Sequence, residues 1–195
     1  MNFTEVVSTV LDIVKRPDRL TQIRAEVNAA LSFCCLANDF ARDLEEDDYA
    51  IDSTLYAQSL ALATFTRFRK FAYIKPSDVK YYINPISGDK IFTSSRVSGC
   101  KEEVDRYYIA GDNVLFKTSA LHSTLLIGHF KYPPTLTDAS PSFWLLDAAP
   151  YAIIERASSQ MFKKIGDDAS AKTHAASFSE MYMPMCRDLS LGSSA

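Results

Sequence analysis

The sequence predicts an α+β fold in which a four-helix layer carries an inserted small antiparallel β-sheet or barrel. Apolar residues recur every three or four positions near both ends of the chain, which is typical of amphipathic helices. Between Tyr56 and Lys131 this pattern changes to alternation broken by turn-forming residues. The 195 residues, 47% hydrophobic and 23% charged, are enough for a sizeable core, so a folded globular protein is expected.

We treat residues 1–195 as a single domain with an inserted module. Two helices come from each end of the chain and form the helical layer. The expected parts are an N-terminal helical hairpin (1–42), a β insert (54–132), C-terminal helices (141–188) and a flexible Ser/Gly-rich tail (189–195).

The first helix is predicted over Thr4–Lys15, with Thr4 as its cap, because valines and leucines form one face. Arg16-Pro17-Asp18 interrupts the pattern. A second, longer amphipathic helix then extends to about Ala37, and the two helices form a hairpin.

The segment from Asp43 to Asp52 carries six carboxylates and no basic residue. It contains no histidine and no fixed helical spacing, so it does not resemble a set of metal ligands. We interpret it as an acidic loop in solvent.

The β insert is expected to contain about five strands joined by short turns. A phase slip in the alternation between Leu60 and Tyr73 suggests an edge strand or a bulge. The other predicted strands are 81–83 and 90–92 around a turn-rich loop, 107–109 and 114–116 around Ala110-Gly111-Asp112-Asn113, and 123–131.

The clearest helix in the sequence covers Ala149–Ile165. Pro150 suits a first helical position, and Ile153, Ala157, Met161 and Ile165 fall four residues apart. Gly166 is suited to the left-handed conformation that ends a helix.

A last helix is expected after Gly166, with Asp167 or Asp168 as its cap. Its apolar face contains Phe178 and Met181 or Tyr182, and Pro184 should kink or end it.

The sequence offers no recognisable catalytic, cofactor-binding or metal-binding motif. It has no glycine-rich phosphate loop and no Gly-x-Ser-x-Gly sequence, and its three histidines stand apart. Cys34, Cys35, Cys100 and Cys186 show no Cys-x-x-Cys spacing, so reduced and mostly buried thiols of a cytosolic product are expected. No apolar run reaches the ~20 residues of a membrane span and no basic leader is visible, so a soluble protein without a membrane partner is expected.

One segment mixes basic and aromatic residues in a way that could contact nucleic acid. Arg67, Arg69 and Lys70 interleave with Phe65, Phe68 and other aromatic residues. The alternative is a half-exposed strand whose long basic side chains cover its outer face, and this interpretation is favoured. The formal net charge of −3 gives no general attraction to DNA.

Both ends of the chain resemble the head-to-tail adaptor (connector) proteins of tailed bacteriophages. At the start, Met1-Asn2-Phe3-Thr4-Glu5-Val6-Val7 leads through Arg16-Pro17-Asp18 into the helix around Arg24-Ala25-Glu26-Val27. Near the end, Trp144 is followed by Pro150-Tyr151-Ala152-Ile153-Ile154 and Phe162-Lys163-Lys164-Ile165-Gly166. Roughly 80 residues carry this similarity, and the β insert is only compatible with it.

The resemblance implies a non-enzymatic virion protein, made in the host bacterial cytoplasm. Such adaptors form a homo-oligomeric ring, commonly of twelve copies, below the portal protein, and extend the DNA channel towards the next tail protein. The portal-docking role would fall on Arg187, Asp188, Leu189 and Leu191. Arg67, Arg69 and Lys70 would face the DNA channel or the surface, with non-specific contact to passing DNA.

Two other functions stay open at this point. The first alternative is a phage or bacterial enzyme with an unrecognised serine or cysteine nucleophile. The other is a single-stranded nucleic-acid-binding module that uses the segment around Arg67 and Arg69.

Overall fold

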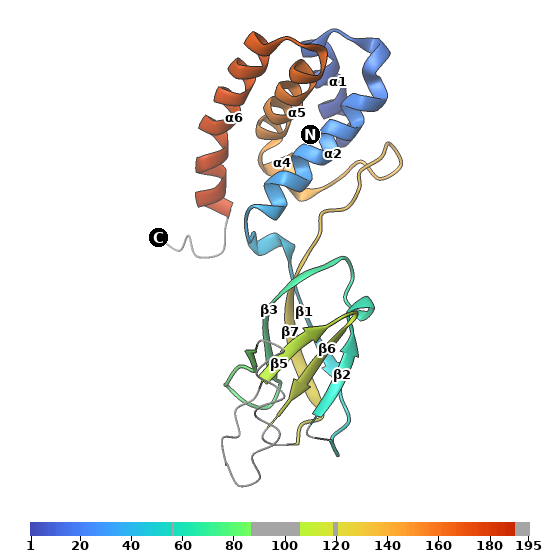
Figure 1. The fold of residues 1–195 in the computed structure, drawn as a ribbon, viewed down its shortest axis with the longest axis vertical. Helices are drawn as coiled ribbons and strands as arrows, with labels where there is room; N and C mark the ends of the chain where they lie inside the picture. The colour runs from blue at the N-terminus through green and yellow to red at the C-terminus, as the bar shows by residue number, and fades with distance from the viewer. Residues whose placement is uncertain (56, 87–105, 119–120, 190–195) are drawn as a thin grey trace. The chain divides into compact units, whose positions relative to one another are not determined.

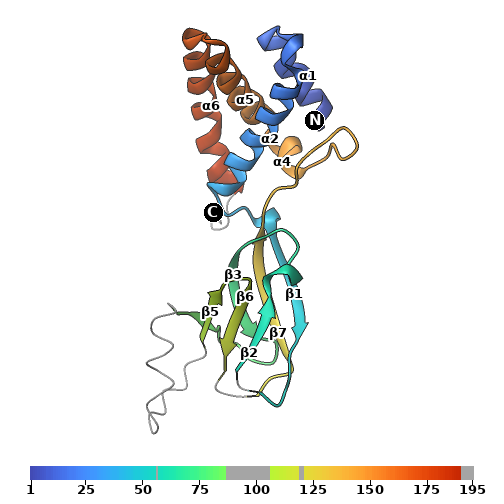
Figure 2. The same ribbon diagram turned by 45° about the vertical axis from the view of Figure 1, so that its right-hand side comes forward.

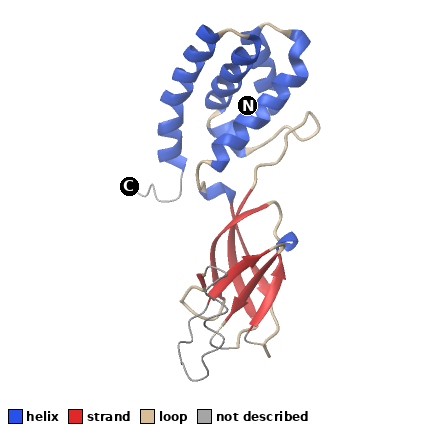
Figure 3. Cartoon of the chain, in the orientation of Figure 1, coloured by secondary structure: helices blue, strands red, loops and turns tan. Residues whose placement is uncertain are grey.

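The computed structural model describes residues 1–195 except 56, 87–105, 119–120 and 190–195. The described chain forms two compact units (Figure 1). The helical unit contains Met1–Asp43 and the chain from Tyr132 onwards, and the β unit contains Leu44–Lys131. All the described α-helices belong to the first unit and all the described strands to the second (Figure 3), which confirms the α+β class.

The helical unit is built around α5 (Pro150–Ile165), which packs against α1, α2 and α6. Both ribbon views place α5 between α2 and α6 (Figures 1 and 2). The other helices are α1 (Phe3–Val14), α2 (Leu20–Leu36), α4 (Trp144–Ala148) and α6 (Asp168–Leu189), with the short 3-10 helices η1 (Pro17–Arg19) and η2 (Ala41–Asp43). The core of this unit contains Val6, Val10, Ile23, Leu31, Ile153, Ala157 and Met161.

Helix α1 begins one residue earlier than predicted, and its cap is Asn2 instead of Thr4. The Asn2 side chain accepts a hydrogen bond of 2.9 Å from the Glu5 backbone N–H, and the Glu5 carboxylate accepts one of 2.9 Å from the Asn2 N–H. This reciprocal capping box satisfies two N–H groups at the start of the helix, which a threonine cap at position 4 would not do.

The prediction for α5 is confirmed at both ends. Pro150 occupies its first position, and Gly166 ends it with a φ of 80°.

Asp167 caps the next helix, because its carboxylate accepts hydrogen bonds from the Ser170 N–H at 3.0 Å and the Ser170 hydroxyl at 2.7 Å. Helix α6 does not end at Pro184 but continues to Leu189. Leu189 is thus helical, and the remaining predicted tail lies outside the described residues.

The β unit contains two sheets. The three-stranded sheet has the order β1-β7-β3, and the four-stranded sheet has the order β2-β6-β5-β4. Every pair is antiparallel except the short β4–β5 pair. The strands are β1 (Leu44–Ala50), β2 (Ala57–Ala61), β3 (Phe68–Pro76), β4 (Asn84–Pro85), β5 (Arg106–Ala110), β6 (Asn113–Lys117) and β7 (Thr124–Lys131), with a 3-10 turn, η3, at Leu62–Thr64.

The predicted acidic loop is wrong, because most of it is strand β1. The β unit consequently starts at Leu44, earlier than the predicted boundary at 54. Strand β1 pairs along its length with β7, for example Glu45 with His129 and Asp47 with Ile127. Pairing with a well-formed apolar strand outweighs the low strand propensity of consecutive Asp and Glu residues.

Other strand predictions agree with the structure. The hairpin of β5 and β6 turns at Gly111, where φ is 57°, and β7 covers the predicted 123–131 segment almost completely. The predicted phase slip corresponds to two register shifts in the pairing of β3 with β7. The 81–83 segment is not a strand, although the Ile83 N–H donates to the Ile74 carbonyl at 2.8 Å, and the predicted 90–92 strand lies outside the described residues.

Candidate functional site

The described residues contain no group of three or more His, Cys, Asp and Glu side chains that could hold a metal ion. Over the same residues, every helix is too short or too polar to cross a membrane.

Each histidine lies beside a carboxylate that is distant in the sequence, a feature that sequence reasoning missed. His122 Nδ1 lies 3.0 Å from Asp78 Oδ1, and His174 Nδ1 lies 2.7 Å from Glu155 Oε2. His174 also stacks on the Phe162 ring, with centroids 5.2 Å apart. No sequence spacing signals these pairs, because each joins two different elements of the fold.

The His122–Asp78 pair is part of a three-residue side-chain network. Its buried imidazole has the Asp78 carboxylate on Nδ1 and the Tyr81 hydroxyl 3.3 Å from Nε2. A carboxylate, an imidazole and a hydroxyl in this order resemble the groups of a nucleophilic triad, with tyrosine in the nucleophile position. In the fold they connect the turn after β3 to the segment that precedes β7.

Among the described residues of the β unit, His129 is the most completely buried polar side chain. Its Nε2 lies 3.4 Å from Glu45 Oε2, and a backbone contact with Thr66 also favours the protonated ring. The imidazole packs against the rings of Phe65 and Phe68, with centroids 5.2 and 6.1 Å away. Burial lowers the pKa of His129, and the nearby Glu45 carboxylate opposes that shift only in part. His129 is accordingly neutral at pH 7.

Cys34 and Cys186 are free thiols. Cys34 and Cys35 are buried on α2, and burial raises the pKa of the Cys34 thiol to about 12. A thiol with that pKa is a poor nucleophile near neutral pH. Cys186 is half-buried, and Cys100 lies outside the described residues.

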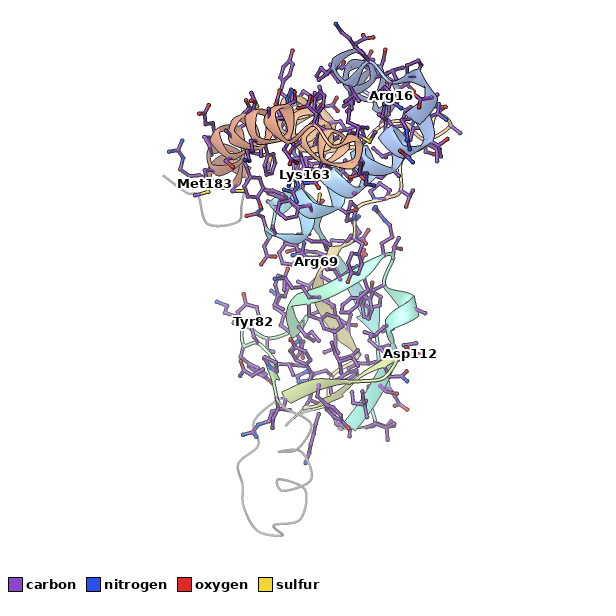
Figure 4. All side chains as sticks on the ribbon, turned by 45° about the horizontal axis from the view of Figure 1, so that its top comes forward. Arg16, Arg69, Tyr82, Asp112, Lys163 and Met183 are labelled. Atoms are coloured by element: carbon purple, nitrogen blue, oxygen red, sulfur yellow. The ribbon has the colours of Figure 1, made fainter. Side chains whose placement is uncertain are left out.

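The three-stranded sheet carries most of the charged residues singled out by the sequence. Arg69 (labelled in Figure 4) and Lys70 lie in β3. Their cationic groups lie 5.2 and 5.4 Å from the centroid of the Phe130 ring on β7. Arg67 is exposed and precedes β3 in the left-handed conformation, with a φ of 50°. This placement supports the interpretation of basic side chains that cover the face of a sheet.

Across the same sheet, Tyr73 on β3 reaches Glu46 on β1. The tyrosine ring passes over Gly128 of β7, and its hydroxyl donates a hydrogen bond to the Glu46 carboxylate. The Ser77 hydroxyl donates to Asp48 at 2.6 Å. These contacts connect the two outer strands over the middle one.

The predicted portal-docking residues lie at the end of α6. Arg187, Asp188 and Leu189 form its last turn, whereas Leu191 lies outside the described residues. Two methionines just before them are exposed: Met181 by 40% and Met183, labelled in Figure 4, by 70%. The helical period predicts Met181 or Tyr182 on the apolar face of this helix, and of the two Tyr182 is half-buried.

A hollow of about 420 Å³ opens on the helical unit. Asn28 holds one wall, because its side chain exchanges two hydrogen bonds with the backbone of Leu136, at 2.8 and 3.1 Å. Arg24 and Asp138 form an ion pair of 2.5 Å beside it. The lining residues are Phe3, Arg24, Leu136, Thr137, Asp138 and Ala139.

No protein-family model matches this chain, and no curated protein is similar to it in sequence.

Proposed function

We propose that this chain is a non-enzymatic virion subunit, a head-to-tail adaptor that forms a ring below the portal and extends the DNA channel towards the tail. The sequence resemblance at both ends supports the proposal. The structural observation that carries it is the exposed apolar surface of α6, immediately before the residues to which the resemblance assigns portal docking.

The first half of α6 is held firmly against the rest of the helical unit. The Arg156 guanidinium of α5 lies 3.6 Å from the centroid of Phe33 on α2 and 5.2 Å from that of Phe178 on α6. The Phe33 and Phe178 rings also meet edge to face, with centroids 6.1 Å apart. Three helices therefore share one cation–aromatic cluster that fixes the base of α6.

Beyond this cluster, α6 exposes methionine side chains to solvent. Methionine is flexible and polarisable, and it is common at protein-binding surfaces. Exposed apolar residues at the end of an anchored helix suit a partner with an apolar groove. In the proposed function that partner is the portal protein.

Co-purification with the portal protein of the same genome tests the docking role of α6. We expect the full chain to co-purify with a tagged portal, and a chain without residues 186–195 to be lost from it. Met183→Asp should weaken docking at least tenfold, because it places a charge in an apolar contact. Lys172→Asp, on an exposed position of the same helix, is the matched control and should dock normally.

Normal docking of both the truncated chain and the Met183→Asp variant would exclude α6 as the portal contact. Circular dichroism of each variant must first show that its helical unit is folded.

A further inference from the structure

The three-stranded sheet carries opposite charges on its two outer strands. The acidic edge consists of Glu46, Asp47 and Asp48, which are exposed on β1. The basic edge consists of Lys75 at the end of β3 and Lys80 in the turn after it. Strand β7 separates the two edges, so they lie about 10 Å apart at the usual strand spacing.

The two edges also lie at the same level of the sheet. Strand β7 pairs Leu126 with Asp48 on one side and with Lys75 on the other. Strands β1 and β3 therefore run in the same direction, and the acidic and basic residues lie at matching heights. A copy displaced sideways along the sheet would bring Asp47 and Asp48 of one chain towards Lys75 and Lys80 of the next.

The charges of both edges are only partly used within the chain. Glu46 accepts from Tyr73, and Asp48 accepts from Ser77. Within the described residues, Asp47, Lys75 and Lys80 form no salt bridge. Cationic and anionic groups therefore remain available to a second molecule.

Charged edge strands usually prevent edge-to-edge aggregation. That protection works when like charges meet, as in a contact between two β1 edges or between two β3 edges. It fails when β1 of one copy meets β3 of another, because opposite charges then attract. The charge pattern thus disfavours the two symmetric contacts and favours the single head-to-tail one.

The basic edge also carries an aromatic residue suited to an interface. Tyr82 (labelled in Figure 4) follows Lys80 by two residues and is 55% exposed. Its ring contacts that of Tyr73, with centroids 5.7 Å apart. Tyrosine is enriched at the centre of protein interfaces. The Ile83 N–H already donates to the Ile74 carbonyl, so the contact uses side chains and not an added strand.

We infer that the acidic edge of one copy binds the basic edge of the next copy of this chain. Such a heterologous contact gives a closed ring or an open filament, depending on the rotation between neighbours. The inference rests on the proposed function, since docking of several copies on one portal would bring these edges together.

Charge reversal tests the contact directly. The double variants are Asp47→Lys with Asp48→Lys, which makes both edges basic, and Lys75→Glu with Lys80→Glu, which makes both edges acidic. In sedimentation velocity at 50 mM NaCl, each variant alone should self-associate at least tenfold more weakly than the wild type. An equimolar mixture of the two should recover the association, and 500 mM NaCl should weaken it again.

Matched controls carry the same charge changes on the helical unit. Asp12→Lys with Glu180→Lys, and Lys163→Glu with Lys172→Glu, alter exposed positions and should leave self-association unchanged. Carbodiimide cross-linking of mixed isotope-labelled and unlabelled chains should join Asp47 or Asp48 of one copy to Lys75 or Lys80 of another.

Two results overturn the inference. One is that the mixture of the two charge-reversed variants associates no better than either variant alone. The other is that the wild-type chain is monomeric in solution and contacts no second copy on the portal. Failure of the proposed function looks different. In that case the wild type self-associates with the charge dependence above and does not bind the portal.

Discussion

Tyr73, Gly128 and Glu46 show how single residues determine the surface of the β unit. The absence of a side chain at Gly128 lets the Tyr73 ring cross the middle strand and reach Glu46. Burial, together with the hydrogen bond to Glu46, raises the pKa of Tyr73 to about 12. The tyrosine hydroxyl is therefore protonated, and donates, across the physiological pH range.

Gly128→Ala should destabilise the β unit by about 1–3 kcal/mol, because an added Cβ would lie 2.7 Å from the Tyr73 ring and displace it. Differential scanning calorimetry measures the effect. In a Tyr73→Ala background the same substitution should cost markedly less. Equal costs in both backgrounds would show that the ring contact is not the cause.

His129 should make the β unit less stable below about pH 6.5. Burial lowers its pKa in the folded state, so the unfolded chain binds the proton more readily. Its stabilising contribution is therefore fully present above pH 6.5 and is lost as pH falls. Hydrogen exchange of peptides from β7 should accelerate between pH 7 and 5, after correction for intrinsic rates. His129→Phe should remove that acceleration, and an unchanged pH dependence in this variant would contradict the assignment.

At this scale the sequence identified residue types but not their partners. It drew attention to Arg69 and Lys70 as basic side chains among aromatic residues, and both cations lie near the Phe130 ring. Alternation alone would place these consecutive residues on opposite faces, and the register shift between Phe68 and Lys70 interrupts that alternation. It missed every histidine–carboxylate pair, since those contacts join residues that only the tertiary fold brings together.

At the scale of elements, predictions succeeded where local chemistry determines the outcome. The helix from Pro150 to Gly166 has its apolar period, its start and its stop in the sequence itself. Strand β1 has no such signal, because its exposed acidic residues resemble a solvated loop. Its pairing partner β7 begins more than 70 residues later, and no local pattern reports that contact.

Helix α6 provides a prediction at the same scale. Pro184 lies inside this helix without a backbone N–H to donate, so Pro184→Ala should stabilise the last turns, by up to about 3 kcal/mol. Hydrogen exchange of residues 180–189 should slow. Met183→Ala, at the exposed neighbouring position, is the control and should change the exchange little. Unaltered exchange in Pro184→Ala would show that tertiary contacts hold this segment instead.

At the scale of the whole molecule, both chain ends contribute to one helical unit, and the middle of the chain forms the β unit. This division gives the proposed adaptor two separate surfaces. The end of α6 would contact the portal, and the charged edges of the three-stranded sheet would contact neighbouring copies. Because the two surfaces lie in different units, substitutions in one should leave the other contact intact.

The most direct test of the adaptor proposal is co-expression of this chain with the portal protein of the same genome, followed by negative-stain averages of the purified complex. The proposal predicts a ring of this chain stacked on the portal and sharing its rotational axis. A bare portal, with this chain left free in solution, would contradict it.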